Sequence, residues 1–227
     1  MAFRAAEGMF VVTLYHFSGS HQIALNEKGY KKIIELSSLS YLKNDELSDP
    51  HLDFNVLLND NSGVCLFSGS INGLFGKLFD KGKLLEISKL YSNLNKSFKD
   101  RFYLEIQRHN EPGEKVFEDF LLKTSKKFNL PLIASQEIYY LDQIMSEAHD
   151  SLVCIKNKTF LDEVNRKRYS NEHYIRNTKD LEKIYSDIPE ALENNYNFPF
   201  RFNFKPKKSD PILPKIKENI NNSVETE

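Results

Sequence analysis

Three short apolar runs in the middle of the chain have the length and boundaries of β-strands. They are VCLFS (residues 64–68), RFYLEIQ (101–107) and LPLIAS (130–135), each bounded by Gly, Asn, Asp or Pro. Between these runs, apolar residues recur with the spacing of one face of a helix. The two helical faces consist of Ile87, Leu90, Tyr91, Leu94 and Phe98, and of Phe117, Phe120, Leu121 and Phe128. This order with short connections predicts βα units, and hence a parallel sheet covered on its outside by helices.

The segments on either side of this unit are predicted to be helical, apart from the two ends of the chain. Helices are expected over residues 26–42, over 145–155 and twice within 178–198, where Pro189 opens the last helix. The first 23 residues connect poorly with the helix predicted after them. Either Met9–Tyr15 supplies an earlier strand, or the chain lacks its beginning. Residues 206–227 contain three prolines, many charges and no sustained period, so a linker or flexible tail is predicted.

Composition limits the class of protein. The chain carries 31 Lys and Arg against 32 Asp and Glu, a net charge of −1, whereas a surface that wraps nucleic acid needs clustered cations. No run of 18 apolar residues occurs, and Met9–Tyr15 is too short for a secretion signal, so no membrane contact and a cytoplasmic location are predicted. Cys65 and Cys154 lie in apolar runs and are expected to be buried, free thiols.

Several polar residues occupy places where chemistry could occur, and each has a simpler structural interpretation. No Gly-rich phosphate loop is present in the sequence. His109 follows a strand, where barrel enzymes place functional groups, but a loop histidine with local hydrogen bonds is the simpler hypothesis. His149 has acidic neighbours, but helical residues two apart point about 200° apart, so a packing role is predicted. Glu105 and Arg108 are predicted to be surface or rim residues on opposite faces of a strand.

Five segments in a fixed order resemble one protein family. They are residues 26–42, 63–82, 100–142 (in which RFYLE, QRH and LPLIA follow one another), 147–155 (EAHDSLVCI) and 187–198 (DIPEALENNYNF). They resemble the alpha subunits of bacterial DNA polymerase III, over most of the N-terminal PHP (polymerase and histidinol phosphatase) domain and the start of the polymerase core. The resemblance covers about residues 24–205. It implies a divergent segment at 1–23, an incomplete PHP-type domain at 24–160, the start of the polymerase core at 161–205, and a linker or tail at 206–227.

The resemblance also implies where a metal site would lie. In family members with a working site, the PHP domain is a distorted (βα)7 barrel that binds metal ions at the carboxyl ends of its strands. The family's HxH motif has no counterpart in this sequence. Ser70 stands where the family's SGC pattern has a thiolate. In residues 136–140, which match the family's NDVHY, Glu137 keeps a carboxylate but Tyr139 replaces an imidazole. Because a hydroxyl and a phenol are poor ligands for transition metals near pH 7, a degenerate site without metal is predicted.

The function that the resemblance implies belongs to the parent polymerase, which synthesises DNA with magnesium held by palm-domain aspartates. Those aspartates would lie beyond residue 227, so no catalytic residue and no cofactor are predicted for this chain. We predict an incomplete piece of the alpha subunit that acts as a PHP-domain scaffold. The implied partners are other DNA polymerase III holoenzyme subunits, including the proofreading exonuclease, with DNA and dNTPs reached through the polymerase core. The alternative is an active PHP-type metal-dependent phosphoesterase or exonuclease.

The predicted fold class is α/β: a partial PHP-type β/α barrel with an open, mostly parallel sheet, outer helices, C-terminal helices and a flexible tail. A barrel closes only when its first and last strands pair, and three to five strands are expected here. We therefore expect unpaired backbone groups at the sheet edge. We also expect the apolar inner face, including Leu66, Leu104, Ile106 and Ile133, to be only partly covered.

Overall fold

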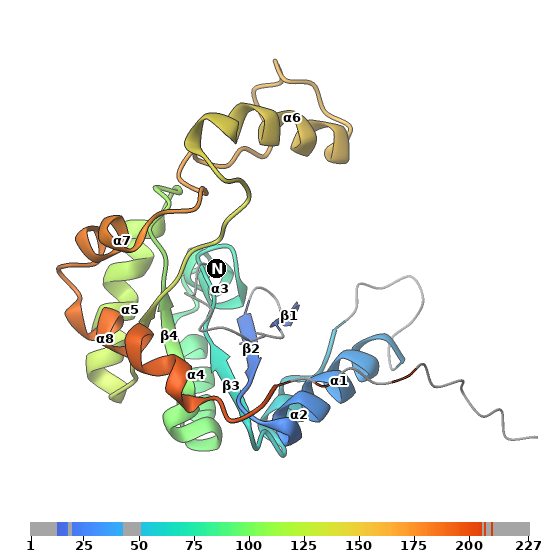
Figure 1. The fold of residues 1–227 in the computed structure, drawn as a ribbon, viewed down its shortest axis with the longest axis vertical. Coiled ribbons are helices and arrows are strands. Elements are labelled where there is room, and N and C mark those ends of the chain that lie inside the picture. Colours follow the sequence, from blue (N-terminus) through green and yellow to red (C-terminus); the bar gives the residue numbers. More distant parts are fainter. Residues whose placement is uncertain (1–12, 18–19, 43–50, 206, 208–209, 211–227) are drawn as a thin grey trace, which may run out of the picture.

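The structure is a computed structural model that describes residues 13–17, 20–42, 51–205, 207 and 210. Its centre is a five-stranded sheet in the order β1-β2-β3-β4-β5 (Figure 1). The strands β3, β4 and β5 pair in parallel, whereas β2 pairs antiparallel with both β1 and β3. Four strands therefore run in one direction and β2 runs against them. The bounds are β1 (Thr13–Phe17), β2 (Ser20–Ala24), β3 (Val64–Phe67), β4 (Phe102–Ile106) and β5 (Leu132–Ala134).

Helices connect the strands and cover one face of the sheet. α1 (Glu27–Leu42) and α2 (Phe54–Leu58) lie between β2 and β3, α3 (Leu74–Asp80) and α4 (Leu84–Phe98) between β3 and β4, and α5 (Glu114–Phe128) between β4 and β5. After β5 come α6 (Ser146–Asn157), α7 (Thr178–Ile184) and α8 (Pro189–Asn197), with short 3-10 turns η1 (Lys99–Arg101), η2 (Gln143–Met145) and η3 (Phe198–Arg201). α6 stands apart from the sheet, whereas α8 lies beside β5 (Figure 1).

Successive strand residues point to opposite faces of the sheet, and both faces are apolar. Leu66 of β3 and Leu104 and Ile106 of β4 face the helices and belong to the larger core. The alternate residues Cys65, Phe67, Tyr103 and Ile133 form a second cluster on the other face, together with Phe198 of η3. The η3 turn therefore covers the face that a closed barrel would enclose.

The prediction of a partly covered inner face is wrong in two respects. Leu66, Leu104 and Ile106 lie on the face covered by helices, and only Ile133 lies on the inner face. All four are at most 1% exposed, so neither face is left open at these positions. The Phe198 ring packs on the rings of Phe67 and Tyr103, with centroids 5.2 and 5.8 Å apart. Because each buried aliphatic side chain contributes about 1.5–3 kcal/mol, covering this face removes the expected loss of stability.

The β5 edge of the sheet is capped by two asparagines of α8. Asn195 Oδ1 accepts a hydrogen bond from Ala134 N (3.1 Å), and Asn195 Nδ2 donates to Ala134 O (2.7 Å). Asn194 Nδ2 donates to Leu132 O at 2.7 Å. A side-chain amide offers a donor and an acceptor as a peptide group does, so these side chains take the place of a further strand. The expected unpaired groups at this edge are thus satisfied.

Most of the predicted elements are confirmed. The three predicted strands form β3, β4 and β5, helices occupy the predicted segments, and Pro189 opens α8. The α/β class with an open sheet and outer helices is confirmed, while the antiparallel β1–β2 pairing was not predicted. Of the candidate strand Met9–Tyr15, only residues 13–15 are described, as part of β1. The predicted tail from 211 onward lies outside the described residues, and the domain boundary at 161 stays a prediction.

Both cysteines are buried, free thiols, as predicted. Burial raises the pKa of Cys65 to about 12, so this thiol does not form a reactive thiolate near neutral pH. Within the described ranges, no helix combines the length and apolar character needed to cross a bilayer.

Candidate functional site

Polar side chains gather where the three parallel strands end. The carboxyl ends of β3, β4 and β5 share one edge of the sheet, which is where α/β proteins place their functional groups. Ser68, Gly69 and Ser70 follow β3, Gln107 and His109 follow β4, and Ser135 and Glu137 follow β5. These residues form two connected clusters, an inner one around Glu105 and an outer one around His109.

Glu105 is the centre of the inner cluster and is 1% exposed. Its carboxylate lies 2.8 Å from His21 Nδ1 and accepts hydrogen bonds from Gly69 N and Gln107 Nε2, each at 3.1 Å. The Ser135 hydroxyl donates to the same carboxylate. Gly69 has a φ of 85°, a conformation that glycine adopts without strain. Donors from β2 and from the ends of three further strands thus converge on one carboxylate.

The pKa values of Glu105 and His21 move in opposite directions. Burial alone would raise the pKa of Glu105, but the charge and hydrogen bond of His21, with those of Ser135 and Gln107, outweigh it and lower the pKa. Burial alone would lower the pKa of His21, but the Glu105 carboxylate outweighs it and the pKa is raised. Both shifts favour the charged pair, so the inner cluster contains a buried ion pair.

Ser135, Glu105 and His21 are the residue types of a hydrolase triad in a different order. In a triad, the serine hydroxyl donates to the imidazole, and the carboxylate orients the other ring nitrogen. Here Ser135 Oγ and His21 Nδ1 both contact the Glu105 carboxylate, which lies between them. The carboxylate accepts a hydrogen bond from the serine hydroxyl, so this arrangement stabilises a buried charge and does not activate a nucleophile.

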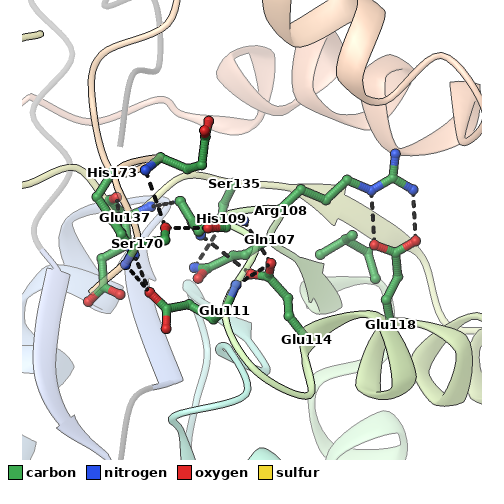
Figure 2. A network of polar contacts seen from close by, with 12 residues as sticks. Gln107, Arg108, His109, Glu111, Glu114, Glu118, Ser135, Glu137, Ser170 and His173 are labelled. Carbon is green, nitrogen blue, oxygen red and sulfur yellow. Dashed lines mark hydrogen bonds and ion pairs between the residues drawn. The ribbon is translucent and has the colours of Figure 1, made fainter. Parts of the chain in front are cut away.

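The outer cluster contains two stacked histidines, and Figure 2 shows the polar network around them. The rings of His109 and His173 are parallel within 2°, with centroids 4.2 Å apart. His109 Nε2 accepts a hydrogen bond from Glu137 N at 3.1 Å, and its Nδ1 lies 3.5 Å from Glu114 Oε1. His173 Nδ1 lies 2.9 Å from Glu137 O, and its Nε2 lies 2.9 Å from Glu111 Oε1. Both ring nitrogens of His173 are therefore engaged by acceptor groups of the same chain.

Carboxylates fix the loop that follows β4. Glu114 Oε2 accepts hydrogen bonds from the backbone N–H of His109 (2.7 Å) and of Glu111 (3.3 Å). Glu111 Oε1 accepts a further hydrogen bond from Ser170 N at 2.9 Å. Figure 2 shows the side chains of Glu111 and Glu114 pointing back toward the two histidines. The loop is therefore held by hydrogen bonds within the chain.

Tyr139 lies in a stack of rings that connects the sheet with α6. Its ring centroid is 4.8 Å from that of His173 and 4.8 Å from that of His149, with interplanar angles of 30° and 8°. Tyr139 N also donates to His173 O at 2.9 Å. Burial, followed by the neighbouring Glu137 carboxylate, raises the pKa of Tyr139, so its phenol stays protonated. The stack therefore fastens the base of the α6 segment to the end of the sheet.

The donors near Ser70, Glu137 and Tyr139 do not fit a transition metal. Ser70 lines a cavity of about 10 Å³ with Glu105, Gln107 and Glu114, close to the smallest space that holds one water. His109 Nε2 faces Glu137 N, and the two His173 nitrogens face Glu137 O and Glu111, so these nitrogens are directed at groups of the chain and not at a shared ion. Across the described ranges, no group of three or more His, Cys, Asp or Glu side chains is placed to hold an ion.

The structure corrects several interpretations of single residues. Glu105 is not a rim residue. Its side chain lies on the same face of β4 as Tyr103, the face that η3 covers, and it is 1% exposed. His109 is buried. Its backbone N–H forms the predicted local hydrogen bond, with Glu114, and its Nε2 also accepts a hydrogen bond from Glu137 at the end of another strand. Arg108 does lie at the rim, where it pairs with Glu118 at 2.7 Å and with Asp187 at 2.6 Å. The predicted packing role of His149 agrees with its place in the ring stack.

His21, Ser135 and His173 are among the residues of the site that were not identified from the sequence. Their hydrogen-bond partners lie between 28 and 84 positions away along the chain. The one available signal was the carboxylate of Glu105 between Leu104 and Ile106, since a charge inside an apolar strand needs a partner when it is buried.

Both a protein-family model and individual known proteins match this chain. A family model described as "PHP domain" matches residues 8–109. The chain is similar to proteins named DNA polymerase III subunit alpha: 34% identical over 192 residues to that of Caulobacter vibrioides and 33% over 192 residues to that of Rickettsia bellii. The protein of that name from Borreliella burgdorferi is 31% identical over 194 residues. The matches cover 85% of this chain but only 16–17% of the length of these relatives.

Proposed function

Because this chain belongs to the family of bacterial DNA polymerase III alpha subunits and matches their PHP-domain region, we propose that it is a scaffold of the replicative DNA polymerase with no metal-dependent activity of its own. The observation that carries the proposal is that the polar groups at the strand ends already form hydrogen bonds with each other and with the backbone. The Glu105 carboxylate and the two stacked histidines are committed to partners within the chain. Groups so engaged hold the strands together and are not available to a substrate or a metal.

The proposed degenerate site comprises Ser70, Glu137 and Tyr139. Each of the two replacements removes a ligand type that divalent transition metals prefer, a thiolate at 70 and an imidazole at 139. The raised pKa of Tyr139 supports the proposal, because a protonated phenol is a weak donor to a metal ion. Its place between His173 and His149 supports a structural role for this side chain instead.

The wider role proposed for the chain follows from the family. As part of a DNA polymerase III alpha subunit, it would contact other subunits of the holoenzyme, including the proofreading exonuclease, in the cytoplasm. DNA and dNTPs would be bound by the polymerase core, where magnesium would serve the synthesis reaction. We favour the scaffold over the alternative phosphoesterase or exonuclease, because the carboxylates and histidines that the structure describes at the strand ends are directed at partners within the chain and not at one shared point.

Elemental analysis of the purified chain after incubation with zinc and manganese tests this proposal. We expect substoichiometric metal, and no hydrolysis of phosphomonoesters or of DNA ends. The matched variant Ser70→Cys/Tyr139→His restores the two family ligands, and we expect it also to bind less than one equivalent, because the neighbouring histidines remain engaged. One tightly bound ion in the wild-type chain, or hydrolysis that disappears in Glu137→Ala, would contradict the scaffold proposal.

A further inference from the structure

Residues 198–204, here called the strap, lie on the face of the sheet that a closed barrel would enclose. They include η3 and lead from α8 toward α1 (Figure 1). Near the end of the strap, Asn203 N donates to Leu25 O at 3.2 Å. The ring centroid of Phe204 lies 5.2 Å from that of Tyr30 in α1. The strap is therefore attached to the sheet at its beginning, through η3, and to the region of α1 at its end.

The strap contributes to only one of the two apolar clusters. Phe198 belongs to the smaller cluster and Phe202 packs against it, whereas in the described part of the chain the larger cluster contains no residue of the strap. The β5 edge is capped by asparagines of α8, which precede the strap. Loss of the strap's contacts would thus leave the helices, the strand pairing and the larger cluster in place. A segment of this kind opens at a lower free energy than the whole fold.

Arg201 fastens the strap to the beginning of β4. Its Nη1 donates to Asp100 O at 2.6 Å and to the Tyr103 hydroxyl at 2.5 Å, and its Nη2 donates to Asp100 Oδ2 at 2.6 Å. The Asp100 side chain is 78% exposed. All three residues line a groove of about 700 Å³, so water and ions reach these contacts. Since salt weakens an ion pair that is open to solvent, this attachment can break while the buried clusters stay packed.

We propose that the strap opens as a unit while the rest of the fold stays closed, and that Arg201 is the residue that holds it shut. Opening would uncover the smaller cluster, including Cys65, Phe67 and Tyr103. In the closed state the Cys65 thiol is fully buried, so a thiol reagent reaches it only after an opening. Cys65 therefore reports on the strap from within the covered face.

The position of Cys65 relative to the strap supports its use as a reporter. Burial raises the pKa of this thiol, and the nearby charge of Arg201 opposes the rise. Arg201 thus acts on Cys65 across the covered face. The inference goes beyond the proposed function, because a strap can open whether or not the strand ends bind a metal. The two proposals can therefore fail independently.

Alkylation of the whole chain by iodoacetamide at increasing urea concentrations tests the inference, with each cysteine followed by peptide mass spectrometry. A local opening exposes little surface and depends weakly on urea, whereas global unfolding has the full dependence. We expect the Cys65 rate to be nearly flat at low urea and to rise steeply close to the unfolding transition. Cys154 lies in α6, outside the strap, and serves as an internal reference.

Two arginine variants identify the contact that holds the strap. Arg201→Gln removes the charge, and we expect it to raise the Cys65 rate at low urea at least about tenfold, without changing the Cys154 rate. The matched control Arg166→Gln removes an arginine that pairs with Asp150 in α6, and we expect it to leave the Cys65 rate unchanged. Raising the salt from about 0.1 to 1 M should speed the Cys65 reaction in the wild type and not in Arg201→Gln.

Urea unfolding followed by circular dichroism establishes that each variant is folded. If Arg201→Gln does not fold, Phe202→Ala takes its place, because it removes a ring that packs at the margin of the same cluster. A Cys65 rate with the global urea dependence at every concentration would overturn the proposal, since the thiol would then be exposed only by complete unfolding. A rate at low urea that Arg201→Gln and Arg166→Gln raise equally, or that neither raises, would overturn it as well.

Discussion

Replacing Glu105 by alanine should destabilise the fold more than replacing any exposed carboxylate. The variant removes the acceptor shared by His21, Gly69, Gln107 and Ser135. Each hydrogen bond to a charged group contributes about 1.5–3 kcal/mol, but such contributions are not additive. Loss of one partner of a buried ion pair costs about 3–5 kcal/mol, because the other charge stays buried. We therefore expect Glu105→Ala to lose about 3–5 kcal/mol, a large share of the roughly 5–15 kcal/mol of a typical domain.

The pH dependence of stability gives a second signature of the same pair. The raised pKa of His21 contributes stability fully below its ordinary value of 6.5, and this contribution is lost as the pH rises through the raised value. The lowered pKa of Glu105 contributes stability above its ordinary value of 4.5, and this is lost as the pH falls through the lowered value. The contribution of the pair is therefore greatest between these two ordinary values, pH 4.5 to 6.5.

Urea denaturation followed by circular dichroism at several pH values measures both effects. We expect the wild-type free energy of unfolding to fall as the pH rises above 6.5, by at most about 1.4 kcal/mol per pH unit. Glu105→Gln keeps the shape but not the charge, so it should flatten this dependence. Glu86→Ala, a control that removes a half-exposed carboxylate paired with Lys83, should change stability by less than about 1 kcal/mol. A Glu105→Ala loss no larger than that of the control, or an unchanged pH profile in Glu105→Gln, would refute the role assigned to the pair.

Three further predictions concern contacts that join distant segments. Asn195→Ala leaves Ala134 N and O without their α8 partners and should lower the free energy of unfolding by about 1–3 kcal/mol in urea denaturation. An unchanged midpoint would mean that other groups form hydrogen bonds with this edge of the sheet. Tyr139→Ala should speed amide hydrogen exchange in α6, whereas Tyr139→Phe, which keeps the stacked ring, should preserve most of the protection; equal exchange in both would contradict a role for the stack. Arg101→Ala removes donors to Asn61 O and Val64 O, each at 2.5 Å, and should cost about 1.5–3 kcal/mol. Full recovery with Arg101→Lys would argue against a need for the guanidinium fork.

Many of the helices and strands of this fold are encoded locally. The apolar runs that become β3, β4 and β5 and the helical spacings of α4 and α5 can be identified without any partner, because strand and helix periods are properties of consecutive residues. The family could also be identified, since motifs such as RFYLE and DIPEALEN keep their order along the chain. The proposed loss of metal ligands at Ser70 and Tyr139 rests on the same kind of information, the residue type at a position matched to the family.

The contacts that decide the chemistry of the site were set only by the tertiary structure. Glu105 was expected at the rim, and its burial depends on His21, a residue 84 positions earlier on a strand that pairs antiparallel with β3. The cover of the second face by Phe198 likewise depends on a turn that follows α8. Periodicity states which residues of a strand share a face, but not which other segment covers that face. That choice is made by burial and hydrogen bonding between segments far apart in sequence, and no local pattern contains it.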